Sequence, residues 1–587
     1  MKLKNFWHIL LLCVIGAGFV SCKAEKDSDE KVLNLTVSAK VKGMDPIYSN
    51  DLYSSNEIAR VYEGLLEYHY LKRPYELTPN LAASMPKISD DGKTYTFKLK
   101  KGVYFHDDEA FEKGKGREVI AQDFVYSLKR LADPKLQATG WWTLDGKIQG
   151  LNEWREKYGD RDEVDYSEEI EGLKALDKYT LQFKLTKPYP QFLYTLAMPF
   201  TFVVAEEVVE RHGKEFLNHP VGTGPFMLDE FDQGNKIVYK KNPNFRKKLF
   251  PSEASDEFKK YLDHAGEKLP FADKIIVEII REDQPRWLNF QRGNLDFIAI
   301  PKDNFETAIT PGKGLTDQFK KKGIELDITP SLDVTYTAFN HDKELFQNVN
   351  LRRAMMAAYN LPKANELFFN GTAIAAQSVV PPGIAGHMKD YKNPYIGPDV
   401  EKAKELLKKA GYPGGQGLRT ITYDTAASTV SRQMGEFFKK RMDEIGINIR
   451  VRQNPWPELQ KKITNRQVDL YGIAWGADYP DAQNFLQLLY GPNSSPGPNG
   501  AGYDNEKFNK MYKKATTMQP GSERAALYEK MNKYVAEQVP WIFGVHRQNY
   551  VLRQGWLENF VNSDFSAGRA QYLDVDKKKK KELMKKF

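Results

Sequence analysis

Trp475, Gly476 and Asp478 are the residues whose types and spacing best suit ligand recognition. They follow a short apolar segment, 468–473, which predicts a strand that ends at this point. A glycine lets a ligand approach the backbone closely, an indole offers a flat apolar wall, and a carboxylate accepts a cation. The same stretch is also typical of a turn in which the carboxylate caps local amides. Taken by itself, the segment leaves both interpretations open.

Motifs of catalytic or metal chemistry are weak elsewhere in the sequence. There is no GxxxxGK[ST] phosphate loop, no GxSxG elbow, no HExxH and no paired CxxC. Asp478 and Asp481 are conceivable as the acid and base of an exported hydrolase, but three positions along a turn give no sign of the separation such a pair needs. His106 stands beside Asp107 and Asp108, and three adjacent residues cannot all face one ion, which favours a turn. We expect no metal, no cofactor and no enzymatic activity.

The first 22 residues have the order of a bacterial export signal. Lys2 and Lys4 precede an apolar run, Ile9 to Val20, which is shorter than the ~20 residues needed to cross a bilayer. Small and aliphatic residues before Cys22 resemble a lipobox, in which the cysteine sulfur is acylated and the chain is cut just before it. An ordinary signal peptide with an incidental cysteine is the alternative. We predict a signal peptide over 1–21, a lipid on Cys22 and a charged tether over 22–31.

Composition indicates a large exported body held together by burial alone. Cys13, the only other cysteine, lies inside the predicted signal, so the mature chain has no disulfide partner for Cys22. A length of 587 residues suggests several lobes, and no later segment is long and apolar enough to cross a membrane. The net charge of +8 is spread along the chain, and nothing indicates nucleic-acid binding. The lysine run 577–581 is interpreted as a solvated, frayed tail.

Strands and helices alternate irregularly along the chain. Apolar residues at every second position predict strands that begin near Val32, at 94–100 and around Leu181 to Leu185. Helical spacing predicts one helix through Phe124, Leu128 and Leu131, ended by Asp133-Pro134. It predicts another through Ala403, Leu406, Leu407 and Ala410, with Asp399 as its N-cap and Gly411 as its end. Such a mixture is typical of α/β lobes with some α+β character.

A series of short motifs, each weak alone, occurs in one order along the chain and resembles a known family. The sequence is similar to the bacterial extracellular solute-binding proteins of the peptide, oligopeptide and nickel class, the receptors of ATP-driven importers. The resemblance covers about residues 33 to 556. The segments that carry it are Met44-Asp45-Pro46, Tyr62 to Leu66, Pro79-Asn80-Leu81-Ala82, 90–102, Ala121 to Ser127, Val221 to Phe226, Asn242-Pro243-Asn244-Phe245, Phe339-Asn340, Leu351 to Ala354, 401–411 and Trp475 to Asp481.

This resemblance implies an α/β fold: a two-lobed, periplasmic-binding-protein-like clamp (type II, large cluster) with an extra domain inserted in the first lobe. Two lobes of this kind close over a ligand about a hinge. The expected division is lobe I over 32–68, 196–332 and 549–587, the inserted domain over 69–195, and lobe II over 333–548. The last part of lobe I includes the basic C-terminal tail.

The resemblance also implies a binding site for an extended peptide between the lobes, held through its main chain. Asp478 would receive the α-ammonium of the peptide, because enclosing an ammonium without a partner is costly. Trp475 and Gly476 would flank the first peptide residues, and Trp456 would line a side-chain pocket. Asn50 and Leu52, from the loop after Asp45-Pro46, would face them from the other lobe.

Two departures from the family pattern leave the ligand open. Oligopeptide receptors often carry arginines at the places held here by Gly472 and Ile463, where they help to hold the carboxyl end of the ligand. Members of the family also bind nickel complexes, opines or sugars on the same scaffold. The expected protein is a monomeric lipoprotein on the periplasmic side of a bacterial membrane or on the cell surface. Its expected partners are a short peptide, an ABC permease and the membrane that holds its lipid.

Overall fold

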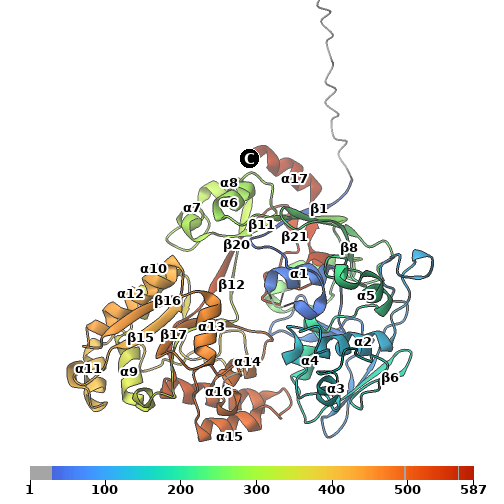
Figure 1. Ribbon diagram of the computed structural model, residues 1–587. Coiled ribbons are helices and arrows are strands. Elements are labelled where there is room, and N and C mark those ends of the chain that lie inside the picture. Colours follow the sequence, from blue (N-terminus) through green and yellow to red (C-terminus); the bar gives the residue numbers. More distant parts are fainter. Residues whose placement is uncertain (1–28, 50, 495–496, 566) are drawn as a thin grey trace, which may run out of the picture.

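The computed structural model describes residues 29–49, 51–494, 497–565 and 567–587, and it contains two lobes (Figure 1). In Figure 1 the yellow and orange elements form the second lobe, and the blue to green elements lie opposite, with β12 and β20 running between the two groups. We use the predicted limits and call 333–548 the second lobe and the rest of the described chain the first lobe. No helix of the described residues is long and apolar enough to cross a membrane.

The first lobe is built on a four-stranded sheet in the order β1-β10-β9-β8. β1 (Val32–Val37) runs parallel to β10 (Lys274–Ile279), and β9 (Lys236–Lys241) and β8 (Phe226–Asp232) follow in antiparallel order. The strand predicted near Val32 is confirmed, and its side chains alternate between buried and half-buried. α1 (Leu52–Val61), capped by the Asp51 side chain, lies beside this sheet.

The predicted inserted domain carries its own antiparallel sheet. Its strands run in the order β4 (Lys87–Ile88), β5 (Thr94–Lys98), β7 (Thr180–Lys184) and β6 (Leu173–Asp177). α2 (Ala121–Ala132) packs against this sheet with its apolar face, and α3 (Leu151–Lys157) follows. The predicted strands, and the helix predicted through Phe124 and Leu131, are thus confirmed. The buried side chains of this sheet belong to the same apolar core as those of β1 and β10.

The second lobe has a five-stranded sheet and a core of its own. The strand order is β16 (Ile449–Asn454), β15 (Ile421–Ala426), β17 (Leu470–Gly476), β13 (Asp333–Phe339) and β18 (Trp541–Phe543). Its longer helices are α9 (Val349–Ala358), α10 (Leu361–Phe369), α11 (Val400–Lys409), α12 (Thr429–Asp443), α13 (Trp456–Thr464), α15 (Glu506–Ala515) and α16 (Ser522–Gln538). The N-cap role of Asp399 is confirmed, because its side chain accepts from the Lys402 amide.

Two adjacent chain crossings join the lobes. The first lobe has a three-stranded sheet in the order β11 (Phe297–Ala299), β20 (Gln548–Gln554) and β12 (Ile324–Pro330). The chain passes from β12 into β13 of the second lobe, and it returns after β18 into β20. The crossings are bonded to each other, because Ser331 N donates to Arg547 O at 2.8 Å and Arg547 N donates to Asp333 Oδ1 at 2.9 Å. Two short antiparallel connections that lie side by side suit a hinge.

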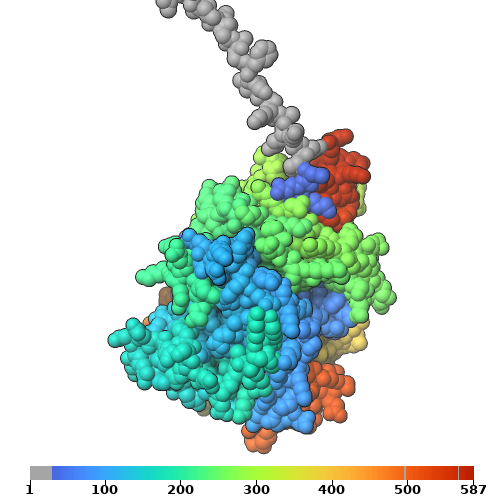
Figure 2. Space-filling model, turned by 90° about the vertical axis from the view of Figure 1, so that its right-hand side faces the viewer, coloured from blue at the N-terminus to red at the C-terminus, as the bar shows by residue number. Residues whose placement is uncertain are grey.

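The C-terminal segment folds back onto the first lobe, which corrects the interpretation of a frayed tail. Residues 577–583 form α17 (Lys577–Leu583), begun by the Asp576 side chain as N-cap. Leu583 is buried, and the Phe587 ring lies 5.8 Å from that of Trp556. Figure 2 shows this red segment beside the start of the described chain, where Lys31 Nζ lies 2.8 Å from Asp574 Oδ1. The five consecutive lysines go all the way around the helix, and the segment is held to the first lobe by its few apolar residues, Leu583 and Phe587.

Candidate functional site

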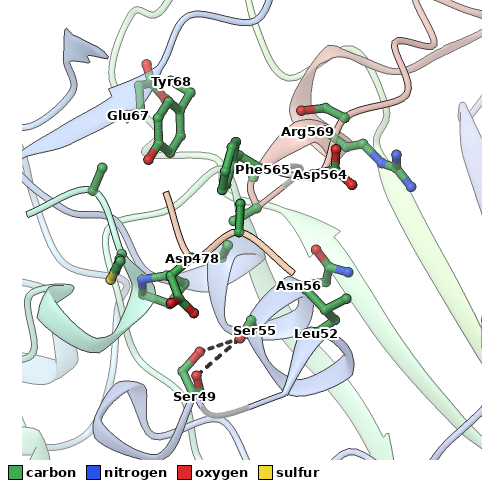
Figure 3. Close-up of a pocket in the computed structure, with 18 of the residues that line it drawn as sticks. Ser49, Leu52, Ser55, Asn56, Glu67, Tyr68, Asp478, Asp564, Phe565 and Arg569 are labelled. Carbon is green, nitrogen blue, oxygen red and sulfur yellow. Dashed lines mark hydrogen bonds between the residues drawn. The ribbon is translucent and has the colours of Figure 1, made fainter. Parts of the chain in front are cut away.

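A cavity of about 880 Å³ lies between the two lobes. The end of β17 contributes Gly476, Ala477 and Asp478, while Leu52 and Ser55 of α1 line the opposite wall (Figure 3). The chain after β20 also lines the cavity and contributes Asp564, Phe565 and Arg569. Tyr68 stacks on Phe565 with ring centroids 4.8 Å apart, which gives the cavity an aromatic wall. The size and the mixture of apolar walls and isolated charges suit a small organic ligand.

Asn484 positions the two principal residues of the motif. It is fully buried at the start of the short helix α14 (Gln483–Leu486). Its Nδ2 donates to Asp478 Oδ2 at 2.9 Å, and its Oδ1 accepts from Trp475 Nε1 at 3.0 Å and from the Asp478 amide at 3.2 Å. Sequence reasoning missed Asn484, because its role depends on how the turn 477–483 folds back toward β17.

Asp478 is a partly buried carboxylate without a positive partner in the described part of the chain. Burial raises the pKa of Asp478 above its usual range, and the Asn484 hydrogen bond opposes this only in part. No lysine, arginine or histidine of the described ranges forms an ion pair with Asp478. A ligand cation would therefore find an uncompensated negative charge in the cavity.

The structure brings three of the predicted site residues to the cavity wall: Gly476, Asp478 and Leu52. A Cβ added at Gly476 would meet no atom within 4 Å, so open space lies over the backbone there. Leu52 is 73% exposed at the first turn of α1, where it faces the cavity. Asn50 and Cys22 lie outside the described residues.

The two tryptophans do not line this cavity. Trp475 packs against the core of the second lobe and is bonded to Asn484. Trp456 is the first residue of α13 and is 46% exposed. Their proposed contacts with ligand stay predictions.

Asp481 has a structural partner, unlike Asp478. Its buried carboxylate forms an ion pair with the buried guanidinium of Arg524 in α16, and its Oδ1 accepts from the Gln483 amide at 2.9 Å. A carboxylate held in this way is not available to act with Asp478 as a catalytic acid–base pair. The alternative of an exported hydrolase thereby loses the residues on which it was based.

Comparison with known proteins decides the family. The model of the bacterial extracellular solute-binding proteins, family 5 Middle, matches residues 76–497, more than half of the chain. The chain belongs to the family 5 solute-binding proteins.

Curated relatives of this family 5 protein match over most of their length. It is 28% identical to heme-binding protein A of Haemophilus influenzae over 531 residues. The aligned stretch covers 88% of this chain and 87% of that protein. It is 26% identical to the dipeptide-binding protein of Escherichia coli over 542 residues. The aligned stretch covers 91% of this chain and 92% of that protein.

Solved structures confirm the predicted fold class. The periplasmic binding protein DppA of Helicobacter pylori, in complex with the peptide STSA, is similar with a TM-score of 0.70 and 26% identity, over 93% of this chain and 99% of that one. HbpA2 of Haemophilus parasuis gives a TM-score of 0.75 at 22% identity, over 93% of this chain and all of that one. The family 5 protein is therefore a two-lobed type II clamp.

Arg569 is a cavity residue of this family 5 protein that the sequence did not reveal. Its guanidinium lies 4.8 Å from the Phe297 ring and 5.2 Å from the Phe560 ring, and it makes no ion pair with any described acidic residue. Desolvation lowers the pKa of Arg569 to about 10, a value at which it still carries its charge at neutral pH. The resemblance to the family ends near Trp556 and its last motif at Asp481, so nothing in the sequence marked this position.

Asp564 and Arg547 complete the charged lining near the hinge. Burial raises the pKa of Asp564 to about 6, although its carboxylate accepts from the Leu332 amide at 3.1 Å. Arg547 is paired with Asp333, which leaves it less available to a ligand than Arg569. Among the described residues, the cavity therefore offers two carboxylates without an ion pair, Asp478 and Asp564, and one guanidinium without an ion pair, Arg569.

Proposed function

We propose that this family 5 protein is the lipid-anchored receptor of an ABC importer and that it captures short peptides between its lobes. The observation that carries the proposal is the uncompensated Asp478 carboxylate beside the open backbone of Gly476 in the interlobe cavity. A relative named as a dipeptide-binding protein and a similar structure solved with a peptide support the choice of ligand class.

Asp478 and Arg569 suggest how a peptide would lie. Asp478 would receive the α-ammonium, and the first residue would pass over Gly476, where no side chain intervenes. Arg569 would receive the terminal carboxylate and so take the place of the arginines that are missing at 463 and 472. Charge-assisted contacts at both ends would select zwitterionic peptides without reading their sequence.

Membrane attachment through Cys22 would keep the receptor close to its permease. The first described residues are already fixed to the body, since Lys31 Nζ contacts Asp574 at 2.8 Å. The predicted tether over 22–31 would then hold the clamp near the bilayer surface. A short tether raises the local concentration of receptor, so weak docking to the permease suffices.

Peptide affinity should fall as the pH falls through the pKa of Asp478. The ammonium of the peptide binds the ionised form of the carboxylate, so affinity is highest at neutral pH, where Asp478 is ionised. Burial raises the pKa of Asp478, so the affinity should fall at a higher pH than it would if the aspartate were exposed. Calorimetry between about pH 7.5 and about pH 4.5 measures this loss. Asp564 lines the same cavity and burial raises its pKa to about 6, so it also titrates in this range. In an Asp564→Asn background the loss of affinity should persist, and the further change Asp478→Asn should remove it. Affinity that is constant over this range in the native chain would count against Asp478 as the ammonium site.

Replacement of Arg569 should weaken binding only where the ligand has a free carboxylate. Arg569→Met keeps an apolar stem between Phe297 and Phe560 and removes the charge. Loss of a hydrogen-bonded ion contact of about 1.5–3 kcal/mol corresponds to an affinity about 10- to 100-fold lower. Titration with a peptide and with its C-terminal amide, which has no carboxylate, separates loss of the carboxylate contact from a general change in the cavity. If Arg569→Met weakens both ligands equally, Arg569 does not read the carboxylate.

A further inference from the structure

Asp108, His212 and His219 come together on the first lobe, away from the residues of the interlobe cavity. The histidines lie 104 and 111 residues after Asp108 in the chain. His212 ends α5 (Glu206–His212), His219 follows the next short helix, and Asp108 belongs to the loop after Phe105. The two imidazole rings stack with centroids 3.9 Å apart, so both present Nε2 to the same carboxylate.

We propose that these three side chains bind one Zn²⁺ ion. His212 Nε2 lies 3.0 Å from Asp108 Oδ1, His219 Nε2 lies 2.7 Å from Asp108 Oδ2, and the three ligand atoms all lie within 4.8 Å of one another. Zinc with bonds of about 2.0–2.2 Å in tetrahedral geometry needs ligand atoms about 3.3 Å apart. To hold the ion, the two nitrogen–oxygen contacts would lengthen by about 0.3 and about 0.6 Å, and the two stacked rings would turn apart. Two imidazoles and one carboxylate are also a donor set that zinc accepts.

His219 is the most exposed of the three side chains. The Asp108 and His212 side chains are 7% and 12% exposed, while that of His219 is 45% exposed. An ion could therefore enter past His219 and keep a water molecule as its fourth ligand. Neighbouring charged groups are engaged elsewhere: Asp107 lies 2.7 Å from Lys115, and Glu109 lies 3.5 Å from Arg211. His106 faces the other way, with Nε2 2.9 Å from Gly224 O.

A bound ion would act as a cross-link in a chain that has no disulfide within its described residues. It would join Asp108, in the predicted inserted domain, to the segment 212–219. The shortest stretch of chain that it would close, from Asp108 to His212, spans 104 residues. A cross-link that closes a long stretch of chain stabilises the folded state, because it lowers the conformational entropy of the unfolded chain. Arg117, which follows Asp108 by nine residues, pairs with Glu207 of α5, so one ion pair already joins the two segments without the ion.

Zinc titration of the purified full-length chain, freed of metal by a chelator, tests the proposal. We expect one Zn²⁺ per chain by calorimetry and elemental analysis. Asp108→Asn and His219→Gln should each lower the affinity by about 100-fold. His264→Asn is the matched control: His264 also lies near two carboxylates, at 3.4 and 3.8 Å, but has no second histidine. It should leave zinc binding unchanged.

Two further readouts use folded protein only. Zn²⁺ should raise the melting temperature of the native chain but not that of His219→Gln, whose replaced side chain is half exposed. Co²⁺ bound to the native chain should give the visible absorption of a tetrahedral site, and His219→Gln should lose it. Absence of stoichiometric zinc binding, or equal binding by native chain and His219→Gln, would overturn the proposal.

Discussion

Asp478→Asn should weaken the binding of peptides with a free amino terminus by about 2–5 kcal/mol, an affinity loss of about 30-fold or more. Asparagine keeps the size of the side chain and its hydrogen bond with Asn484 but removes the charge that a buried ammonium needs. Calorimetry with one peptide and its N-acetylated form measures the effect. The acetylated form has no ammonium, so native and variant chains should bind it with similar, low affinity.

Glu67→Gln is the matched control for this experiment. Glu67 also lines the cavity, but its carboxylate is paired with Lys248 at 2.7 Å. Removing its charge should change peptide affinity much less than Asp478→Asn does. Equal affinity of the native chain and Asp478→Asn for the free-amine peptide would exclude Asp478 from the ammonium site.

Arg524→Met should lower the free energy of unfolding by about 3–5 kcal/mol, because it leaves the Asp481 carboxylate buried without a counter-ion. Both side chains are buried, and Arg524 also donates to Met518 O at 3.1 Å. Urea unfolding monitored by tryptophan fluorescence measures the loss. Burial raises the pKa of Asp481, so the carboxyl of the variant takes up a proton readily. The gap between native chain and variant should therefore narrow as the pH is lowered.

The double variant Asp481→Asn/Arg524→Met separates the ion pair from simple packing. It has no buried charge left, so it should be more stable than Arg524→Met alone. If the double variant is no more stable than Arg524→Met, the loss comes from packing of the arginine side chain and not from the pair.

Local patterns made much of the fold predictable from the sequence. β1, β5, β7, α2 and α11 all lie where apolar periodicity and capping residues place them, because each pattern depends on residues within one element. α17 was not predictable in this way, since five consecutive lysines hide a helix that docks through Leu583 and Phe587. Its stability comes from tertiary contact.

The site was predictable only where it lies within a motif. Asp478 and Gly476 belong to one strand end, and the structure places both on the cavity wall. Arg569 lies beyond the last motif of the family, and its position depends on the return of the chain after β20. Asp108 meets His212 and His219 only through the packing of distant segments. The spacing of these residues in the sequence therefore does not predict that they lie together.

Native mass spectrometry of the protein purified from its own host tests the proposed function most directly. Closure of the lobes over a ligand should retain part of it through purification. The account predicts bound masses that match short peptides, lost after partial unfolding and absent from Asp478→Asn. Retention of only non-peptidic molecules, such as a heme or an opine, would contradict it.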